Sequence, residues 1–388
     1  MIHEGYLEDR ARRRLGSLTV YCGPTHSGKT KKLEAEAERA QRQGRRMQRL
    51  SAAPDARRLP EQLDPETELV TIDDAQRYGA SLIEVTDELA TRHRVDVVVS
   101  GWELDYSGAP QGPMPALICC ADMAVKLDDG VCASPGCRNL ASRTQRFQAS
   151  TDRPERFLPV CRRHHSAEAR AADFQEGWFD EPSGSLDVIS GCMFSGKTQE
   201  MIRRLDQERY AGATIQAFKP ALDDRYAIEA VASHREVRFP AIAVPDVAAI
   251  EAQLRDDTRV VGIDEAQFFG AEILPLANTL ADRGLHVIVA GLDLDFLSRP
   301  FGPMPLLSAH ADRLTKLQAS CQYPDCGSHQ ATRTQRLNGS VPASADSPLV
   351  VIGGAGRYEA RCRHHHRIGP LAAVEATPVA TADELAEF

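Results

Sequence analysis

The sequence reads GCMFSGKT at residues 191–198 and GPTHSGKT at residues 23–30. Both stretches fit the pattern G-x-x-x-x-G-K-[ST], in which glycines let backbone N–H groups turn toward phosphate oxygens. A short apolar run precedes each stretch and a helical pattern follows it, so the start of a helix adds positive potential. The pattern therefore predicts two phosphate-binding loops in one chain, each between a strand and a helix.

Four further blocks recur after these loops, in the same order. The recurring pairs lie at 70–80 and 261–271, 97–115 and 287–305, 132–137 and 321–326, and 161–165 and 362–366. Five blocks in one order predict two copies of one unit. The first copy is shorter, both between its loop and its acidic block and between its second and third cysteines.

Strands alternate with helical patterns in each copy, which is typical of a parallel α/β sheet. The last third of each copy has short alternating runs and paired cysteines. We therefore expect an α/β fold with two tandem P-loop (RecA-like) parallel-sheet domains, each with a small β-rich zinc-binding lobe. The expected boundaries are an N-terminal extension at 1–16, the first copy at 17–165, a linker at 166–184, the second copy at 185–370 and a tail at 371–388.

Composition narrows the possible functions. The net charge of −9 argues against a general nucleic-acid-binding surface, which is usually basic. No apolar run reaches the length of about 18 residues needed for a membrane span, and the first residues lack the apolar segment of a secretory signal. We therefore expect a cytoplasmic protein with no nucleic-acid or membrane partner, in which clustered cysteines and histidines indicate metal rather than disulfides.

The second phosphate loop has the residues that such loops use. Lys197 is expected to bridge the β- and γ-phosphates, and the Thr198 hydroxyl to reach Mg²⁺. The first copy keeps the corresponding residues, so its loop is either a second phosphate site or an inherited loop that is not used. The candidate phosphate residues are Gly191, Cys192, Met193, Phe194, Ser195, Gly196, Lys197 and Thr198 in the second copy and Gly23, Gly28, Lys29 and Thr30 in the first.

An acidic pair follows an apolar run in each copy. Asp264 and Glu265 close the run VVGI, where one carboxylate can hold Mg²⁺ and the next can accept a proton from an attacking hydroxyl. The first copy has Asp73 and Asp74 there, and its second acid is one methylene shorter. A base displaced by about 1 Å can lose on the order of 100-fold in rate.

Cysteines and histidines form one group per copy. Three thiolates and one imidazole suit tetrahedral Zn²⁺, and a site with four protein ligands is structural. His364 and His366, and His165 in the first copy, are competing candidates; the remaining Cys22, Cys119, Cys120 and Cys192 are expected to be buried or loop thiols. The expected ligands are Cys321, Cys326, Cys362 and His365 in the second copy and Cys132, Cys137, Cys161 and His164 in the first.

At this point the residues resemble a known family, the zinc-containing P-loop thymidine kinases of the cellular and bacterial type. The second copy matches over nearly its full length, although its first cysteine pair is spaced more widely than in the family. The matching motifs are GCMFSGKT, KPALDDRY, DEAQFF, GLDLDFLSRPFG, CQYPDC, TRTQRL and VVIGGAGRYEARCRHHH. The resemblance implies transfer of the γ-phosphoryl group of ATP to the 5′-hydroxyl of thymidine or deoxyuridine.

The resemblance also implies roles for individual residues. Glu265 matches the family's general base, and Asp264 and Gln267 match residues on the ATP side of the site. The implied cofactors are ATP, Mg²⁺ and structural Zn²⁺. The resemblance implies that the acceptor nucleoside is contacted at its sugar end, by an apolar wall around its base and by a loop that closes over the base. The residues implied are Asp223, Arg225, Met193, Phe268, Leu292, Phe296, Phe301, Thr334, Val351, Ile352, Gly353 and Tyr358. Apart from the resemblance, core packing is the plainer explanation of the three phenylalanines.

The first copy lacks much of this acceptor set. It has no equivalent of KPALDDRY or of VVIGGAGRY, and polar or bulky residues replace apolar ones: Arg77, Trp102 and Gln111 stand where Phe268, Leu292 and Phe301 would be. We therefore expect a non-catalytic first copy that either binds nucleotide or is vestigial. Family members assemble as oligomers, so the chain is expected to form homo-oligomers or an intramolecular pseudo-dimer.

Three alternatives stay open at this point. A P-loop ATPase would turn over ATP without a nucleoside. A binding protein would grip nucleic acid with its zinc lobes, and a nucleotide sensor would have two inactive halves. The sequence does not decide between thymidine and deoxyuridine, nor the strength of feedback by the triphosphate product.

Overall fold

The structure is a computed structural model that describes residues 15–50, 55–127, 130–147, 154–165, 184–221, 230–232, 238–351 and 356–370. Most of the expected N-terminal extension, most of the expected linker and the whole expected tail lie outside the described residues. The expected domain boundaries therefore stay a prediction. Among the described residues, none of the helices has both the length and the apolar character that crossing a membrane would require.

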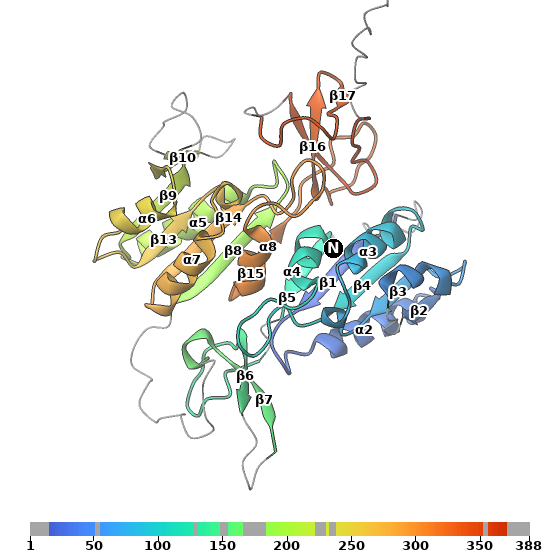
Figure 1. The fold of residues 1–388 in the computed structure, drawn as a ribbon, viewed down its shortest axis with the longest axis horizontal. Coiled ribbons are helices and arrows are strands. Elements are labelled where there is room, and N and C mark those ends of the chain that lie inside the picture. Colours follow the sequence, from blue (N-terminus) through green and yellow to red (C-terminus); the bar gives the residue numbers. More distant parts are fainter. Residues whose placement is uncertain are drawn as a thin grey trace, which may run out of the picture.

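The N-terminal half contains a five-stranded sheet in which all neighbours run parallel (Figure 1). Its order is β2-β3-β4-β1-β5, so the strand before the first phosphate loop lies inside the sheet. Its strands are β1 (Leu18–Cys22), β2 (Met47–Leu50), β3 (Leu69–Ile72), β4 (Asp96–Ser100) and β5 (Met123–Lys126), and its helices are α2 (Lys29–Arg42), α3 (Ser81–Thr91) and α4 (Met114–Cys120).

The C-terminal half repeats this plan with one more strand. Its parallel sheet has the order β12-β9-β13-β14-β8-β15, which matches the first sheet after removal of the edge strand β12. Its strands are β8 (Ser185–Gly191), β9 (Ile215–Pro220), β12 (Ile242–Val244), β13 (Val260–Ile263), β14 (His286–Gly291) and β15 (Arg313–Leu317), and its helices are α5 (Lys197–Tyr210), α6 (Val247–Gln253), α7 (Ile273–Asp282) and α8 (Met304–His310).

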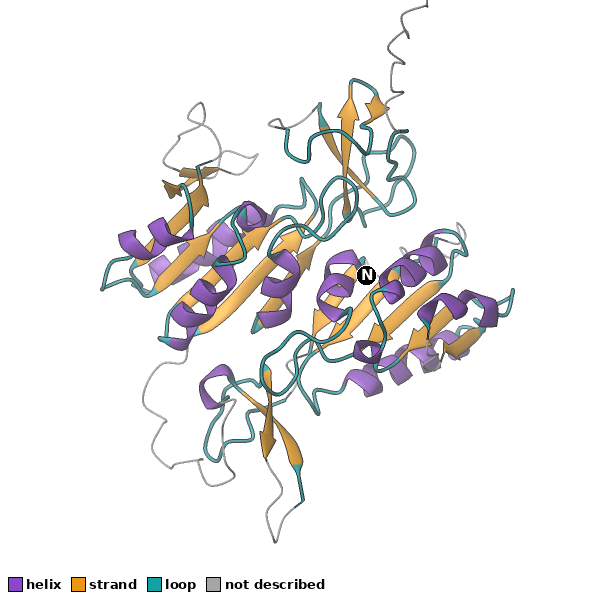
Figure 2. Ribbon diagram, in the orientation of Figure 1, coloured by secondary structure: helices purple, strands orange, loops and turns teal. Residues whose placement is uncertain are grey.

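Two small antiparallel lobes stand apart from the sheets (Figure 2). The N-terminal lobe is a hairpin and the C-terminal lobe is a three-stranded sheet of order β17-β16-β18. The lobe strands are β6 (Arg143–Phe147), β7 (Arg156–Val160), β16 (Arg333–Asn338), β17 (Val341–Pro342) and β18 (Tyr358–Arg361). The C-terminal half also contains a separate antiparallel strand pair, β10 (Ala230–Ala232) and β11 (Arg238–Pro240). The short 3-10 helices of the described residues are η1 (Ala56–Arg58), η2 (Pro60–Gln62), η3 (Ala75–Arg77), η4 (Arg162–His164) and η6 (Ala266–Phe268).

Helices cover both faces of each sheet because the central strands are buried on both sides. In β4, Val97 and Val99 pack on the α3 and α4 side while Val98 faces Leu33 of α2. The second sheet has the same layering, with α7 and α8 on one face and α5 on the other. The α/β fold class predicted from the sequence is therefore confirmed.

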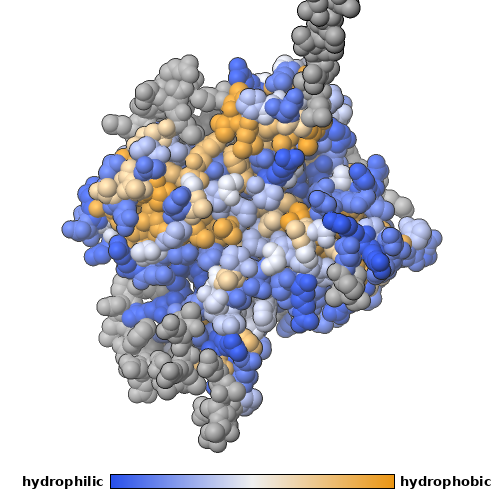
Figure 3. Space-filling view, viewed as in Figure 1, coloured by the Kyte–Doolittle hydropathy of each residue, from blue (hydrophilic) through white to orange (hydrophobic). Residues whose placement is uncertain are grey.

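The two halves contact each other through equivalent elements: α4 packs against α8, and β5 lies beside β15 (Figure 1). Leu314 of β15 packs against the apolar cores of both halves. On the face seen in Figure 3, apolar residues gather mainly over the C-terminal half, and hydrophilic ones over the N-terminal half.

A buried lysine crosses this contact in each direction. Lys126 donates to the carbonyl oxygen of Ala309 at 2.8 Å and pairs with Glu103 at 3.0 Å, and both side chains are at most 3% exposed. Its counterpart Lys316 donates to the Cys119 carbonyl oxygen at 2.5 Å and pairs with Asp293 at 2.6 Å. Each lysine thus joins a carboxylate of its own half to the end of a helix in the other half.

Removing Lys126 should destabilise the protein strongly, because Glu103 would remain buried without its partner. We expect Lys126→Met to lower the free energy of unfolding by about 3–5 kcal/mol, measured by denaturant unfolding. The control Lys32→Met, at an exposed position, should change it by less than about 0.5 kcal/mol. Adding Glu103→Gln to Lys126→Met should restore part of the loss, and equal effects of the two lysine variants would contradict the prediction.

Candidate active site

The second phosphate loop connects β8 to α5. Gly196 adopts the left-handed conformation with φ 87°, which a residue without a Cβ accepts readily, and α5 starts at Lys197. Lys197 is 9% exposed, and its Nζ donates to the Cys192 carbonyl oxygen at 2.8 Å. The lysine therefore lies inside the loop, beside the positive end of the helix.

Asp264 follows the buried strand β13 and reaches the same loop. Its Oδ2 accepts a hydrogen bond from Thr198 Oγ1 at 3.1 Å. Asp264 is 5% exposed, and burial together with the neighbouring Glu265 raises its pKa to about 7. A buried carboxylate beside a threonine hydroxyl has the donor set for a hydrated Mg²⁺ ion.

Glu265 is held in an unusual backbone conformation, with φ 52°, just before the 3-10 helix η6 (Ala266–Phe268). Gln267 Nε2 donates to Glu265 Oε2 at 2.5 Å, and Gln267 Oε1 accepts from the Leu292 backbone N–H at 2.8 Å. Non-glycine residues in this region are uncommon and cluster at functional sites. Gln267 thus ties the Glu265 carboxylate to the end of β14.

Aromatic and apolar residues lie on the loops beside these acids. Phe268 and Phe301 contact edge to face, with ring centroids 5.6 Å apart. Phe296 is 5% exposed, and the Arg336 guanidinium lies 3.5 Å from the centre of its ring. Leu292, at the end of β14, is half-buried. The sequence predicts an apolar wall from Phe268, Leu292, Phe296 and Phe301, and the guanidinium of Arg336 covers one of these rings.

The C-terminal lobe touches the phosphate loop directly. The Met193 backbone N–H donates to Thr334 Oγ1 at 3.1 Å, and Tyr358 Oη donates to the Val351 carbonyl oxygen at 2.8 Å. The lobe thus contacts both the loop at 191–198 and the backbone at Val351. Four of the expected acceptor residues, Asp223, Arg225, Ile352 and Gly353, lie outside the described residues.

The N-terminal half reproduces this backbone frame. Thr30 Oγ1 donates to Asp73 Oδ2 at 3.1 Å, and Asp74 has φ 53°. Gln76 Nε2 donates to Asp74 Oδ1 at 3.0 Å, and Gln76 Oε1 accepts from the Trp102 backbone N–H at 3.1 Å. The phosphate-side geometry is therefore the same in both halves, down to the glutamine after the acidic pair.

The first loop also keeps its lysine. Gly28 adopts the same left-handed conformation as Gly196, with φ 83°, and α2 starts at Lys29. Lys29 Nζ donates to the carbonyl oxygens of Gly23 and Pro24 at 2.9 and 2.6 Å, and burial lowers its pKa.

The surroundings of the first acidic pair differ. Arg77, which stands where Phe268 does, pairs with Asp74 at 3.3 Å, and Arg49 lies 3.5 Å from Asp73. The indole of Trp102 lies 6.0 Å from Lys29 Nζ, and its ring centroid is 6.4 Å from that of Phe157. Guanidinium groups and an indole thus lie near the first acidic pair, whereas Phe268 and Leu292 stand at the corresponding positions of the second half.

Two groups of three cysteines and one histidine have the geometry of zinc sites. In each group the ligand atoms all lie within 4.8 Å of one another. The Cys326 and Cys362 sulfurs are 3.9 Å apart, and Cys362 Sγ lies 3.3 Å from His365 Nδ1. Tetrahedral Zn²⁺ with Zn–S bonds of about 2.3 Å separates its ligands by about 3.8 Å, whereas a disulfide needs about 2 Å. The two groups are Cys132, Cys137, Cys161 and His164, and Cys321, Cys326, Cys362 and His365.

The competing histidines have other contacts. His364 Nε2 lies 2.8 Å from the Gly16 carbonyl oxygen, and His366 Nε2 lies 2.9 Å from that of Phe296. His165 contacts the Tyr106 carbonyl oxygen at 2.8 Å in the same way as His366. The remaining cysteines, Cys22, Cys119, Cys120 and Cys192, are buried free thiols, as expected.

Sequence reasoning missed the pairing of Asp293 with Lys316 below the apolar wall. It also passed over the arginines of the lobes, although SRTQRF at 142–147 recurs as TRTQRL at 332–337. The recurrence of these arginines in both halves was the sequence signal that could have identified them.

Comparison with known proteins gives consistent results. A sequence model of the family described as "Thymidine kinase" matches residues 58–165 and 184–366. The thymidine kinase of Deinococcus deserti is 51% identical over 193 residues, which are 47% of this chain and 94% of that protein. Those of Coprothermobacter proteolyticus and Deinococcus radiodurans are 50% and 49% identical over 194 residues, covering 50% and 47% of this chain and 92% and 90% of the relatives.

Metal analysis of the purified chain should find about two zinc ions per molecule, because each cysteine–histidine group offers four ligands. Cys161→Ser and Cys362→Ser should each reduce the content to about one. Cys119→Ser, which changes a buried thiol outside both groups, should leave it at two. A zinc content that does not respond to the two ligand variants would contradict this assignment.

Proposed function

The chain belongs to the thymidine kinase family, whose reaction is the phosphorylation of thymidine by ATP, and we propose that its C-terminal half performs this reaction. ATP and thymidine are then its small-molecule substrates, and the 5′-hydroxyl of the nucleoside is the acceptor. One observation carries the proposal: hydrogen bonds link Thr198 to Asp264 and Gln267 to Glu265, and Phe268 follows this pair where the N-terminal half has an arginine on its second acid.

The phosphate side of the reaction follows from the loop. Phosphoryl transfer is catalysed mainly by positioning and charge neutralisation. Lys197 and the backbone N–H groups of the loop bind the phosphates, and the buried start of α5 adds positive potential. Thr198 and Asp264 are the residues that would hold Mg²⁺, which supplies further neutralisation of phosphate charge when bound.

Glu265 is the proposed general base. Its Oε2 accepts from Gln267, so the carboxylate is oriented before substrate arrives. The role requires it to accept the proton of the nucleoside 5′-hydroxyl as that oxygen attacks the γ-phosphoryl group. The left-handed backbone at this residue favours the role, because strained residues are often positioned for catalysis.

The acceptor side is proposed to lie along the apolar wall. A flat pyrimidine can stack on an aromatic ring such as Phe301, while Phe296, whose ring is covered by the Arg336 guanidinium, supports this wall from behind and the lobe that carries Tyr358 borders its edge. Met193, Phe268, Leu292, Thr334 and Val351 complete the described part of this set. Asp223, Arg225, Ile352 and Gly353 belong to the same proposal but lie outside the described residues.

The N-terminal half is proposed to be non-catalytic. Its second acid, Asp74, is one methylene shorter than Glu265 and is paired with Arg77. Trp102 occupies the position of Leu292 and lies close to Lys29. The guanidinium of Arg77 thus stands beside the acid at the position that Phe268 has in the other half.

The zinc lobes are proposed to be structural. In the C-terminal lobe, Tyr323 stacks on His365 with ring centroids 4.2 Å apart, which fixes the orientation of that ligand. The lobe then anchors the segment that borders the acceptor, through Tyr358 and Val351.

Changing the two loop lysines distinguishes the halves. Lys197→Met should abolish transfer of labelled phosphate from ATP to thymidine, because the donor phosphates lose their cation. Lys29→Met is the matched change in the other half and should leave turnover within about twofold. Loss of activity in Lys29→Met alone would refute the assignment, and ATP turnover without any nucleoside would favour an ATPase instead.

Replacing the proposed base tests the chemistry. Glu265→Gln should lower kcat by about 10²–10⁴-fold, the usual range for loss of a general base. The KM for ATP should change little, because Lys197 and Thr198 stay in place. The matched variant Asp74→Asn in the N-terminal half should keep full activity; a kcat for Glu265→Gln near that of the unchanged enzyme would rule out the role.

A further inference from the structure

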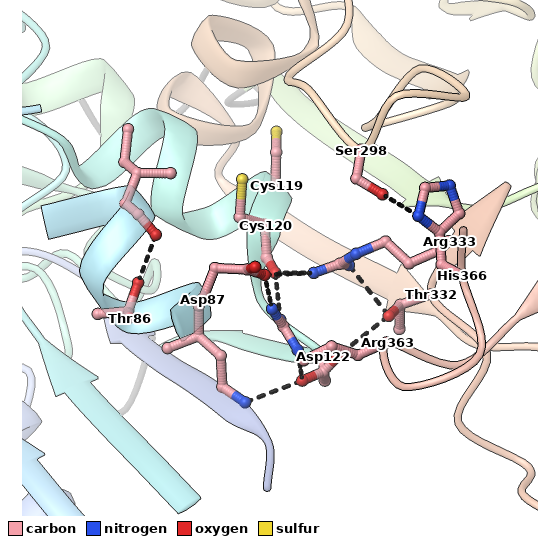
Figure 4. Close-up of polar contacts among 12 residues, drawn as sticks. Thr86, Asp87, Cys119, Cys120, Asp122, Ser298, Thr332, Arg333, Arg363 and His366 are labelled. Atoms are coloured by element: carbon pink, nitrogen blue, oxygen red, sulfur yellow. Dashed lines mark hydrogen bonds and ion pairs between the residues drawn. The ribbon is translucent and has the colours of Figure 1, made fainter. Parts of the chain in front are cut away.

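Two arginines of the C-terminal lobe are buried against the N-terminal half (Figure 4). Arg363 Nε donates to Asp122 Oδ2 at 2.8 Å, and its Nη2 donates to the Cys120 carbonyl oxygen at 2.7 Å. Arg333 Nη2 donates to the same carbonyl oxygen at 2.8 Å, and Arg363 also pairs with Asp87. Both carboxylates that the described part of the chain brings to these guanidinium groups therefore come from the other half.

Asp122 is the centre of this cluster. It lies two residues after the end of α4 and immediately before β5, and its Oδ2 also accepts from the Leu18 backbone N–H at 2.8 Å, which fixes it to β1. Its Oδ1 accepts from Thr332 Oγ1 at 2.9 Å. Burial alone would raise the pKa of Asp122, but the guanidinium groups of Arg363 and Arg333 outweigh burial and hold the pKa far below its usual value. The carboxylate is therefore ionised and satisfied on every side.

The arginines are next to residues of the proposed active site. Arg333 is the first residue of β16, and the following Thr334 accepts the hydrogen bond from the Met193 N–H of the phosphate loop. Arg363 directly follows Cys362, one of the four expected zinc ligands. Each arginine is thus the direct chain neighbour of a residue that contacts the phosphate loop or belongs to the metal group.

The strands of the lobe carry this constraint further. β16 and β18 pair in antiparallel register, from Arg333 opposite Arg361 to Arg336 opposite Tyr358. Arg336 stacks on Phe296, and Tyr358 holds the Val351 carbonyl oxygen. One end of this two-stranded ladder is therefore fixed to the N-terminal half, and the other borders the proposed acceptor site.

The opposite lobe has an equivalent cluster. Arg162 Nε donates to Asp312 Oδ2 at 2.6 Å, Ser142 donates to Asp312 Oδ1, and Arg143 Nη2 donates to the His310 carbonyl oxygen at 2.7 Å. Asp312 also accepts from the Leu186 N–H at 2.9 Å, as Asp122 does from Leu18. The same buried charge pairing thus occurs twice, but only one copy of it borders the proposed active site.

We infer that Asp122 of the N-terminal half is a positioning residue for the C-terminal active site, holding Arg333 and Arg363 so that the lobe keeps Thr334 on the phosphate loop and Tyr358 and Arg336 beside the proposed acceptor site. This inference rests on the proposed function, in which the C-terminal half is catalytic. It gives the N-terminal half a defined role that needs neither nucleotide binding nor turnover. The role is one of geometry, because Asp122 belongs to the opposite half and acts through the lobe.

Asp122→Asn and Asp312→Asn form a matched pair, since each removes one buried negative charge that faces arginines of the opposite lobe. Both should lower the melting temperature by a similar amount. Asp122→Asn should also raise the KM for thymidine by roughly tenfold or more, because small displacements in a site are costly, with the KM for ATP within about twofold. Asp312→Asn should leave the KM for thymidine within about twofold of the unchanged enzyme.

The outcomes separate this inference from the proposed function. If Asp122→Asn lowers the melting temperature without raising the KM for thymidine, or if both variants raise it equally, the inference is overturned. If the inference is overturned but Lys197→Met is inactive, the proposed function still stands. If only Asp312→Asn raises the KM for thymidine, the N-terminal half is the catalytic one and both are overturned.

A milder pair keeps the test decisive if either aspartate variant fails to fold. Thr332→Val removes the hydroxyl that donates to Asp122 and accepts from Arg333 Nη1, and Ser142→Ala removes the hydroxyl that donates to Asp312. Thr332→Val should raise the KM for thymidine by about three- to tenfold, because one or two hydrogen bonds are lost, whereas Ser142→Ala should leave it unchanged. Equal values for this pair would again contradict the inference.

Discussion

Charged groups buried between the two halves must be paired there, because an unpaired charge away from water is far costlier than an unpaired charge at the surface. Lys126 and Lys316 meet carboxylates of their own half and carbonyl oxygens of the other. Asp122 and Asp312 meet arginines that come from the opposite lobes. Each of these groups has partners in both halves, so the relative position of the sheets and lobes is set by charge pairing as well as by the apolar contact of α4 with α8.

The two halves share one backbone conformation around the acidic pair, although their side chains there differ. Asp74 and Glu265 both adopt a left-handed conformation, although neither is glycine, and a glutamine two residues later bonds to each. The frame therefore depends on the strand, the turn and the glutamine rather than on the acid itself. What differs is the region facing the acids, where Arg77 contacts Asp74 but Phe268 packs on Phe301.

Local sequence patterns predicted much of this structure because local physics determines the corresponding features. The phosphate loops need glycine at Gly28 and Gly196, and the apolar runs before the acids could only be buried strands. The cysteine and histidine groups were predicted because metal ligands of fixed type recur at related spacings. In contrast, the pairing of Arg363 with Asp122 joins residues 241 positions apart, and no local pattern specifies such a partner. The edge strand β12 was also missed, since three residues carry too little pattern.

The arrangement gives a structural basis for the proposed division of roles between the two similar halves. The residues near the acids, such as Arg77 and Trp102, follow the carboxyl ends of β3 and β4, whereas Asp122 immediately precedes β5, at the amino end of that strand. A change at one end of a parallel sheet leaves the other end in place, because each strand is rigidly paired along its length. The N-terminal half can therefore lose its acceptor surface while it still presents Asp122 and the Cys120 carbonyl oxygen to the opposite lobe. Its sheet then serves as a support for the second site, and its buried charge network is the part of it that this role requires.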